Sequence, residues 1–311
     1  MEYVLGVDGG ATKTVVQIVN LSGKVVSESE YCSSNFKSAG IKEARENLTR
    51  VVLNAIKKID GQKDFVFKSA CFGMAGYDTL TDGKKYHKMI FKSGIEKYLD
   101  PENTLIYNDT RIGLAASSNS ANAIIIICGT GSNCLGVNER GKEVKVNGWD
   151  YILGDEGSGY AIGVKALKAV MRDYDGRGEE TLLSGTIMED LKIKSIPRLV
   201  SWAYGSAFFK VRIAALARTV CRTAEMGDET SIRILREEAG EAINSISIVV
   251  KKLGLAEKEF DLVFVGNVFK CDKFFKSVLM KEVKAKFKKV NFKPLTEKPV
   301  QGAVKFALDN I

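Results

Sequence analysis

VLGVDGGATKTVVQIVN, residues 4–20, is the stretch that decides the fold. It is an apolar run interrupted by Asp8, two glycines and a Thr-Lys-Thr triplet, after which the apolar residues resume. Adjacent glycines allow a tight turn that brings backbone N–H groups close to a ligand, and threonine hydroxyls add donors for phosphate oxygens. An ordinary Gly-Gly hairpin is the alternative, but a carboxylate within an apolar run favours a phosphate and metal site.

A second stretch, AIIIICGTGSNCLGVNERGK at residues 123–142, repeats the layout of the first. A constant offset aligns Thr12 with Thr130 and superimposes a Gly-Lys pair further along. The repeat predicts a duplicated domain, and two such turns facing each other could hold the two ends of a polyphosphate. Ile126 falls at the position of Asp8, so any metal chemistry belongs to the first turn.

Length and composition are typical of a soluble globular protein. The chain has 311 residues, of which 45% are hydrophobic and 27% charged, and this predicts two domains of similar size and excludes disorder. The longest apolar run, near residues 123–128, is far too short to span a bilayer, and the N-terminus has no basic segment followed by an apolar one. We expect a cytoplasmic protein without a membrane partner.

Cysteines, histidine and net charge exclude several kinds of site. Six cysteines are scattered without a CxxC pair, which favours reduced core thiols over disulfides, zinc or an iron–sulfur cluster. His87 is the only histidine, so a histidine-based triad is excluded and any general base is a carboxylate or another group. The net charge of +8 comes without a nucleic-acid-binding motif, so no nucleic-acid partner is expected.

The rest of the chain alternates apolar runs with amphipathic segments, which predicts an α/β fold. Helices are expected over residues 41–59 and near residues 86–98, and a buried strand over 261–267 ends in Gly266-Asn267. Asp109 follows another short strand and opens a segment that reads as a helix. Because ligands collect at the carboxyl ends of parallel strands, Asp109 is the candidate catalytic residue, with a helix N-cap as its structural alternative.

A loop past the second hairpin is dense in glycine and acid. Glycines flank Asp155-Glu156, and Ser158 or Gly159 begins the helix that follows; this predicts backbone held close to a ligand. Trp149 offers a flat apolar surface and one N–H donor, which suits the face of a sugar, although a buried core tryptophan is the alternative.

Together these residues give the chain its resemblance to the BadF/BadG/BcrA/BcrD group of the actin-like ATPase superfamily, and within that group to the N-acetylglucosamine kinases. The matching segments, in the family's order, are 8–14, 34–35, 73–76, 108–109, 129–133, 148–149, 154–158 and 265–267. The resemblance implies two ribonuclease-H-like α/β domains with a cleft between them. One would comprise residues 1–113 plus the closing helix 299–311, and the other residues 114–298 with helical insertions.

The resemblance also implies ATP and Mg²⁺ as cofactors and assigns roles to individual residues. Asp8 would hold Mg²⁺ directly or through water, and Asp109 would accept the proton of the attacking sugar hydroxyl. The ATP-binding residues would be Gly10, Ala11, Thr12, Lys13, Thr14, Gly129, Thr130, Gly131, Ser132, Gly266 and Asn267. The sugar would be bound by Asn35, Gly76, Asp109, Trp149, Asp155 and Glu156.

The implied function is an ATP-dependent kinase that transfers the γ-phosphate of Mg·ATP to a hydroxyl of N-acetylglucosamine or a related hexose. Lys37 and Arg111 depart from the pattern, because amino-sugar kinases commonly have neutral or aromatic side chains there. If they face the substrate they could pair with a carboxylate, which makes 2-keto-3-deoxygluconate kinase the alternative. Dimers are common among such proteins, so a homodimer is compatible with the resemblance.

Two further classes share the fold. An ATPase activator of 2-hydroxyacyl-CoA dehydratases needs cysteines that hold an iron–sulfur cluster, and no cysteine here has the expected loop context. A sugar-sensing regulator could dispense with Asp8 and Asp109, yet both are present. A kinase is therefore favoured over both.

Overall fold

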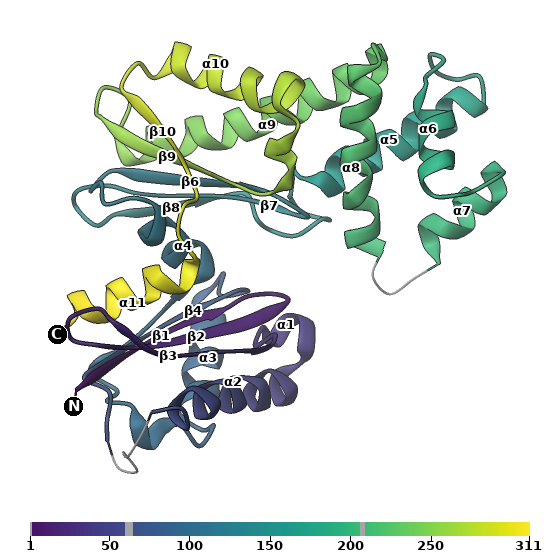
Figure 1. Cartoon of the computed structure of the whole chain (residues 1–311). Coiled ribbons are helices and arrows are strands. Elements are labelled where there is room, and N and C mark those ends of the chain that lie inside the picture. The colour runs from purple at the N-terminus through teal and green to yellow at the C-terminus, as the bar shows by residue number, and fades with distance from the viewer. Residues whose placement is uncertain (1, 60–64, 206–208) are drawn as a thin grey trace. The chain divides into compact units, whose positions relative to one another are not determined.

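The computed structural model describes residues 2–59, 65–205 and 209–311 and divides the chain into two compact units (Figure 1). Unit 1 comprises the residues up to Asn119 together with Leu295–Ile311, and unit 2 comprises Ser120–Pro294. The predicted divisions lie after residue 113 and before residue 299. The first division follows helix α4 (Asp109–Ser117) because α4 packs along α11 (Pro299–Asp309) within unit 1.

Unit 1 is built on a five-stranded mixed sheet in the order β3-β2-β1-β4-β5. The strands are β1 (Tyr3–Gly9), β2 (Lys13–Asn20), β3 (Val25–Cys32), β4 (Ser69–Met74) and β5 (Thr104–Asn108). β1, β2 and β3 pair antiparallel, whereas β4 and β5 run parallel to β1. Besides α4 and α11, the helices are α1 (Phe36–Ala39), α2 (Ile41–Ile56), α3 (Leu80–Ile90) and a 3₁₀ turn at Glu96–Tyr98.

Alternate residues of β1 explain how helices cover both faces of this sheet. Leu5 and Val7 are buried in the core that includes α2 and α3, while Val4 is buried in the core formed with α4 and α11, as the two-residue period of a strand requires. The second face is closely packed: a Cβ on Gly302 of α11 would lie 1.9 Å from the carbonyl oxygen of Ile112. Unit 1 therefore places the carboxyl ends of β1, β4 and β5 between two helical layers.

Unit 2 has a sheet in the order β10-β9-β6-β7-β8. Its strands are β6 (Ala123–Cys128), β7 (Ser132–Val137), β8 (Glu143–Val146), β9 (Phe260–Val265) and β10 (Val290–Pro294). Its helices are α5 (Gly159–Tyr174), α6 (Leu183–Asp190), α7 (Ile196–Tyr204), α8 (Phe209–Glu225), α9 (Glu229–Leu253) and α10 (Ser277–Lys286), with a 3₁₀ turn at Asn267–Lys270 and a π-helical turn at Asp272–Lys276. None of the helices formed by the described residues combines the length and apolar character needed to cross a membrane.

The two sheets repeat one topology. In each, a central strand pairs antiparallel with the next strand of the chain, which pairs antiparallel with the one after it. On its other side the central strand pairs parallel with a later strand, which pairs parallel with the outermost one. Figure 1 shows the same hairpin-led sheet in both units, with the additional helices α5 to α8 in unit 2. This confirms the predicted α/β class and the repeat of the strand–turn–strand segment.

The two repeated turns differ in length. Four residues, 10–13, separate the paired ends of β1 and β2, whereas three residues, 129–131, separate those of β6 and β7. The shorter turn shifts the preceding strand by one position, so the residue corresponding to Asp8 is Ile127 and not Ile126. Both isoleucines are apolar, so the conclusion that unit 2 has no counterpart of this carboxylate is unchanged.

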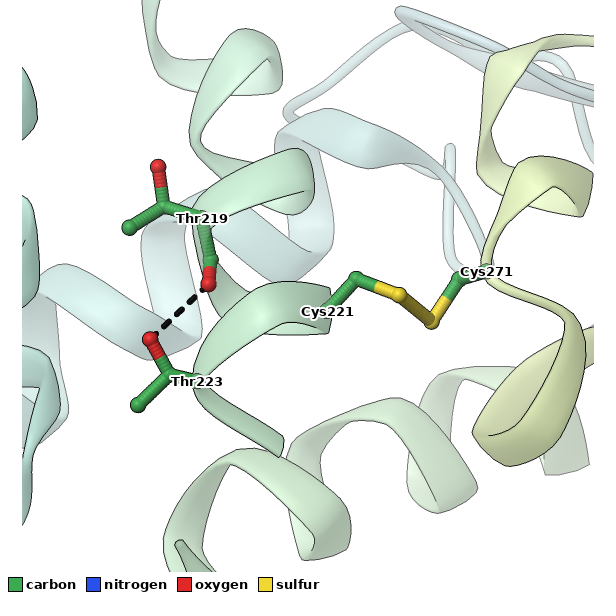
Figure 2. Close-up of a disulfide and its surroundings, with 4 residues drawn as sticks. All are labelled: Thr219, Cys221, Thr223 and Cys271. Carbon is green, nitrogen blue, oxygen red and sulfur yellow. Dashed lines mark hydrogen bonds between the residues drawn. A yellow bond between two sulfur atoms is a disulfide. The ribbon is translucent and has the colours of Figure 1, made fainter. Parts of the chain in front are cut away.

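The expectation of reduced thiols was wrong for one pair of cysteines. Cys221 of α8 and Cys271 form a disulfide, with Cα atoms 5.8 Å apart (Figure 2). They are separated by 50 residues in sequence, so no local pattern could reveal that the fold places them together. The free cysteines are Cys32, which is exposed, and Cys71, Cys128 and Cys134, which are buried.

Candidate active site

Two carboxylates come together at the carboxyl edge of the unit 1 sheet. Asp8 is near the end of β1, and Asp109 begins α4 directly after β5. Burial and the negative charge of Asp109 raise the pKa of Asp8 to about 7, and Lys13 lowers it to a smaller extent. The ionised form of Asp8 is therefore destabilised unless a cation lies beside it, and a bound metal ion would stabilise it.

The donor set suits Mg²⁺. Among residues 2–59, 65–205 and 209–311 there is no cluster of three or more His, Cys, Asp or Glu side chains that could hold a metal by itself. Mg²⁺ commonly binds through one or two carboxylates and takes its other ligands from water and substrate phosphates. Asp8, with Asp109 close by, fits that mode of binding.

Asp109 is not the N-cap of α4, which was its structural alternative. Asn108 is the N-cap, and its side-chain oxygen accepts a hydrogen bond from the backbone N–H of Thr110 at 2.8 Å. The Asp109 carboxylate accepts from the same N–H at 2.9 Å. It lies in the first turn of α4, where the helix dipole favours a negative charge, so capping alone does not require an aspartate at this position.

In the first turn, residues 11–13 are exposed to solvent, and Thr14, which follows the turn, is buried. Ala11, Thr12 and Lys13 are exposed, and Lys13 forms an ion pair with Glu30 at 2.7 Å. Thr14 is fully buried, and its hydroxyl donates to the carbonyl of Cys32 at 3.0 Å. The Thr14 hydroxyl therefore holds the hairpin against β3, and it is the rest of the turn that can face a phosphate.

The second turn is built in the same way with different partners. Gly131 and exposed Thr130 lie between strands β6 and β7, and Ser132 is buried. The Ser132 hydroxyl donates to the carbonyl of Glu156 at 2.7 Å, and its N–H donates to Oδ1 of Asp155 at 3.1 Å. The loop that contains Asp155 and Glu156 thus holds the second turn in place through Ser132. The sequence pattern does not predict this role.

Lys210 is a residue of this region that the sequence analysis missed. It lies in the first turn of α8, and its Nζ donates to Oδ2 of Asp155 at 2.8 Å and to Asp150. Asp155 is 3% exposed, so Lys210 provides the counter-charge that a buried carboxylate requires. No local sequence pattern indicates this pairing, because the two residues are 55 positions apart.

Three expected sugar-binding residues of unit 2 differ in exposure. Asp155 is buried, whereas Glu156 is exposed. Trp149 is 50% exposed, with the Lys145 ammonium 4.8 Å from its ring centroid. Trp149 is therefore not a core residue, and its ring is available to a ligand, as the sugar-binding interpretation requires.

Two of the expected sugar-binding residues of unit 1, Asn35 and Gly76, lie next to each other. Asn35 caps α1 by accepting the N–H of Lys37 at 2.9 Å, and a Cβ on Gly76, whose φ is +85°, would lie 2.8 Å from the Asn35 side-chain oxygen. The Lys37 ammonium is bound by two carboxylates, those of Asp78 at 2.9 Å and Asp82 at 3.0 Å. Lys37 therefore secures the segment after β4 and is already neutralised.

Arg111 points along α4 towards α11. Its guanidinium lies 4.8 Å from the ring centroid of Phe306, a stacking geometry typical of arginine. Both cations that suggested an acidic substrate thus have protein partners within unit 1.

Expected nucleotide-binding residues of unit 2 line one cavity of about 580 Å³. Its walls include Gly129, Thr130 and Asn267, and along α8 the residues Val211, Ala214, Arg218 and Cys221. Gly266 joins the strand end to the turn: its φ is +117°, and a Cβ there would lie 2.2 Å from the carbonyl oxygen of Cys128. The cavity therefore offers a helical wall of small apolar and charged side chains together with a glycine turn, which suits an adenosine with phosphates directed towards the turn.

Comparisons with known proteins cover the whole chain. The model of the BadF/BadG/BcrA/BcrD ATPase family matches residues 5–307. The N-acetylmuramic acid/N-acetylglucosamine kinase of Clostridium acetobutylicum is 36% identical over 304 residues, covering 98% of this chain and 97% of that protein. The N-acetyl-D-glucosamine kinase of Dictyostelium discoideum is 31% identical over 319 residues, covering 99% and 98%.

Solved structures show the same fold. A candidate N-acetylglucosamine kinase from Chromobacterium violaceum has a TM-score of 0.76 at 18% identity, with 99% of each chain covered. The ROK hexokinase of Thermus thermophilus has a TM-score of 0.57 at 15% identity, covering 98% of this chain and 97% of that one. At these identities the likeness concerns the fold alone.

Proposed function

This chain belongs to the BadF/BadG/BcrA/BcrD ATPase family, and we propose that it is an ATP-dependent kinase of N-acetylglucosamine and related amino sugars. The observation that carries the proposal is the end-to-end similarity, at 36% and 31% identity, to two kinases of N-acetylglucosamine. The first of these also takes N-acetylmuramic acid by name, so this sugar is the second substrate that we propose. The paired carboxylates of unit 1 and the cavity of unit 2 supply groups that such a reaction needs.

Asp109 is proposed as the general base. Its carboxylate would accept the proton of the attacking sugar hydroxyl, and a positioned base contributes roughly 10²- to 10⁴-fold in rate. Mg²⁺, when bound with ATP, would neutralise charge on the phosphates, and Asp8 would hold it, directly or through water. Asn35 and Gly76 of unit 1 would position the sugar.

Unit 2 is proposed to hold the nucleotide and part of the sugar. The turn Gly129 to Ser132 would bind the phosphates through the N–H groups of Thr130 and Gly131, because those of Gly129 and Ser132 donate within the protein. Gly266-Asn267 and α8 would surround the adenosine. Trp149 would contact a face of the sugar, while Asp155 and Glu156 would accept hydrogen bonds from its hydroxyls. Such a site accelerates phosphoryl transfer mainly by alignment and charge stabilisation.

The 2-keto-3-deoxygluconate alternative has no specific observation in its favour. It needed Lys37 and Arg111 to face the substrate, but Lys37 is bound by two carboxylates and Arg111 stacks on Phe306. We further propose that the protein is a homodimer, which light scattering would test. We also propose that it is located in the cytoplasm, where ATP is available.

A coupled ADP-release assay with Mg·ATP tests the proposal. The acceptors are N-acetylglucosamine, N-acetylmuramic acid, glucosamine, glucose, N-acetylmannosamine and 2-keto-3-deoxygluconate. We expect the highest kcat/KM with N-acetylglucosamine. Turnover with the sugar acid 2-keto-3-deoxygluconate alone would replace the proposed substrate, and slow ATP hydrolysis that no sugar stimulates would refute the kinase. Iron and a brown colour in anaerobically purified protein would then identify the dehydratase activator.

A further inference from the structure

The Cys221–Cys271 disulfide connects two walls of the cavity that we propose for the nucleotide. Cys221 lies on α8, and Cys271 follows the 3₁₀ turn after β9. Both cysteines line the cavity, together with Gly129, Thr130 and Asn267. The bond therefore fixes the position of the helical wall relative to the wall that follows the strand.

Hydrogen bonds hold the opposite side of α8. The Thr219 hydroxyl donates to Asp190 of α6 at 2.6 Å, and the hydroxyls of Thr223 and Thr186 are 2.9 Å apart. Figure 2 shows Thr219 and Thr223 on the side of α8 away from Cys271, with the Thr223 hydroxyl bonded to the Thr219 carbonyl. Breaking the disulfide would thus remove the covalent link on the cavity side of α8, while α5 and α6 still hold the helix.

The cavity gives access to the disulfide. Cys271 is only 4% exposed, whereas Cys221 is partly exposed and lies on the cavity wall. A small thiol reagent that enters the cavity would therefore meet the Sγ atom of Cys221 first. A nucleotide occupying the same cavity would stand in its way.

We propose that Cys221–Cys271 is a reversible thiol–disulfide exchange site whose redox state sets the affinity of the unit 2 cavity for adenine nucleotides. The inference rests on the proposed function, since it takes this cavity to be the nucleotide site. The co-reactant is a dithiol. One of its thiolates attacks Sγ of Cys221, the Cys221–Cys271 bond breaks, and Cys271 leaves as a thiolate that takes up a proton.

The second thiol of the reductant completes the exchange. It attacks the mixed disulfide, releases Cys221 as a thiol and leaves the reductant as a disulfide, so that the protein gains two electrons and two protons. A disulfide oxidant runs the same steps in reverse. No other redox partner is required.

The expected direction follows from preorganisation. The cavity is open with the bond formed, so a nucleotide entering the oxidised protein meets walls already held together. In the reduced protein the same ligand must also hold in place two walls that are no longer covalently linked, which weakens binding. We expect a loss of about fivefold in affinity, at the lower end of typical coupling between sites. By linkage, the nucleotide lowers the reduction potential of the pair by the same factor, which is about 20 mV for a two-electron couple.

Calorimetric titration with ADP tests the inference in the full-length chain, first oxidised and then reduced with dithiothreitol. We expect the dissociation constant to rise about fivefold on reduction. Cys221→Ser should bind ADP like the reduced protein and should not respond to dithiothreitol. Cys32→Ser, which removes an exposed thiol that has no disulfide partner, is the matched control and should keep the difference.

The rate of reduction provides a test that needs no variant. Trapping of new thiols by iodoacetamide should be several-fold slower with saturating ADP than without it. Equal ADP affinity in both states, equal reduction rates with and without ADP, or Cys221 and Cys271 alkylated as thiols in air-oxidised protein would each overturn this inference alone, provided that the sugar is still phosphorylated. Absence of ADP binding in both states would overturn the proposed function as well.

Discussion

Replacing Asp8 with asparagine should make the protein's stability less sensitive to pH. Burial and the charge of Asp109 raise the pKa of Asp8 from 3.8 to about 7. The shift of roughly three units, at 1.36 kcal/mol each, means that an ionised Asp8 costs the folded, metal-free protein about 4 kcal/mol. Because the folded state binds this proton more tightly than the unfolded state, the contribution of Asp8 to stability is complete below about pH 4 and is lost as pH rises through about 7.

The expected difference can be measured with wild type and Asp8→Asn in parallel. Between pH 5 and pH 8 the wild type should lose about 2 to 3 kcal/mol of unfolding free energy that the variant does not lose. The assay is urea denaturation at both pH values in the presence of EDTA. It is followed by far-ultraviolet circular dichroism, because both tryptophans lie in unit 2 whereas Asp8 lies in unit 1. Comparing the two proteins at each pH cancels the titration of all other groups.

Two results would bear on the reasoning. Parallel stability curves for wild type and Asp8→Asn from pH 5 to pH 8 would refute the raised pKa, and with it the claim that this carboxylate is held as a costly anion. Asp109→Asn should reduce the pH dependence of the wild type, because it removes the charge that contributes to the shift. The Asp8→Asn variant should also lose nearly all kinase activity if Asp8 holds the metal.

Three further substitutions test separate parts of the proposed site. Asp109→Asn should leave ADP and sugar binding nearly unchanged and lower kcat by roughly 10²- to 10⁴-fold in the coupled assay; unchanged turnover would mean that another group is the base. Gly266→Ala should weaken ADP binding at least tenfold in calorimetry, because its Cβ would lie 2.2 Å from the carbonyl oxygen of Cys128, the residue that precedes the second turn. Gly254→Ala is its control, a helix C-cap with φ +69° and nothing within 4 Å, which should lose about 1 kcal/mol of stability with ADP affinity unchanged. Arg111→Ala should lower stability by about 0.5–1 kcal/mol through the lost stacking on α11 and leave kcat/KM for N-acetylglucosamine within twofold; a large loss of kcat/KM would return this arginine to the substrate site.

Local patterns predicted the parts of the fold that local chemistry determines. Apolar alternation and the glycine turns located both hairpins, and the strand-end position of Asp109 placed it at the sheet edge beside Asp8. The helix expected near residues 86–98 lies instead at Leu80–Ile90. Its start was encoded locally by a capping box, in which Thr79 and Asp82 satisfy each other's backbone N–H groups, and this signal was overlooked.

Contacts between distant segments could not be predicted in this way. The pairing of Lys210 with Asp155 and the Cys221–Cys271 disulfide each depend on where α8 crosses unit 2. Sequence spacing contains no information about that crossing, because a helix of this kind can pack on any apolar face. The partner of Lys37 is a similar case, since its two carboxylates come from the segment after β4.

The two repeated turns share one kind of support, a buried hydroxyl that is hydrogen-bonded to a backbone carbonyl, although we propose different roles for the two units. In both, the last hydroxyl of the turn is buried and bonded to protein, Thr14 to a carbonyl of β3 and Ser132 to the carbonyl of Glu156. A turn braced in this way has its backbone N–H groups fixed before a phosphate arrives, and this lowers the cost of organising the site during reaction. Only the first turn is preceded by a carboxylate, because Ile127 takes the place of Asp8 in unit 2. The electrostatic cost is thereby confined to the unit that we propose for metal binding and proton transfer, while unit 2 keeps an apolar strand and gains the cavity. An ionised Asp8 destabilises the folded unit 1, so a neutral residue at this position would increase stability. The presence of Asp8 in β1 is therefore best explained by function.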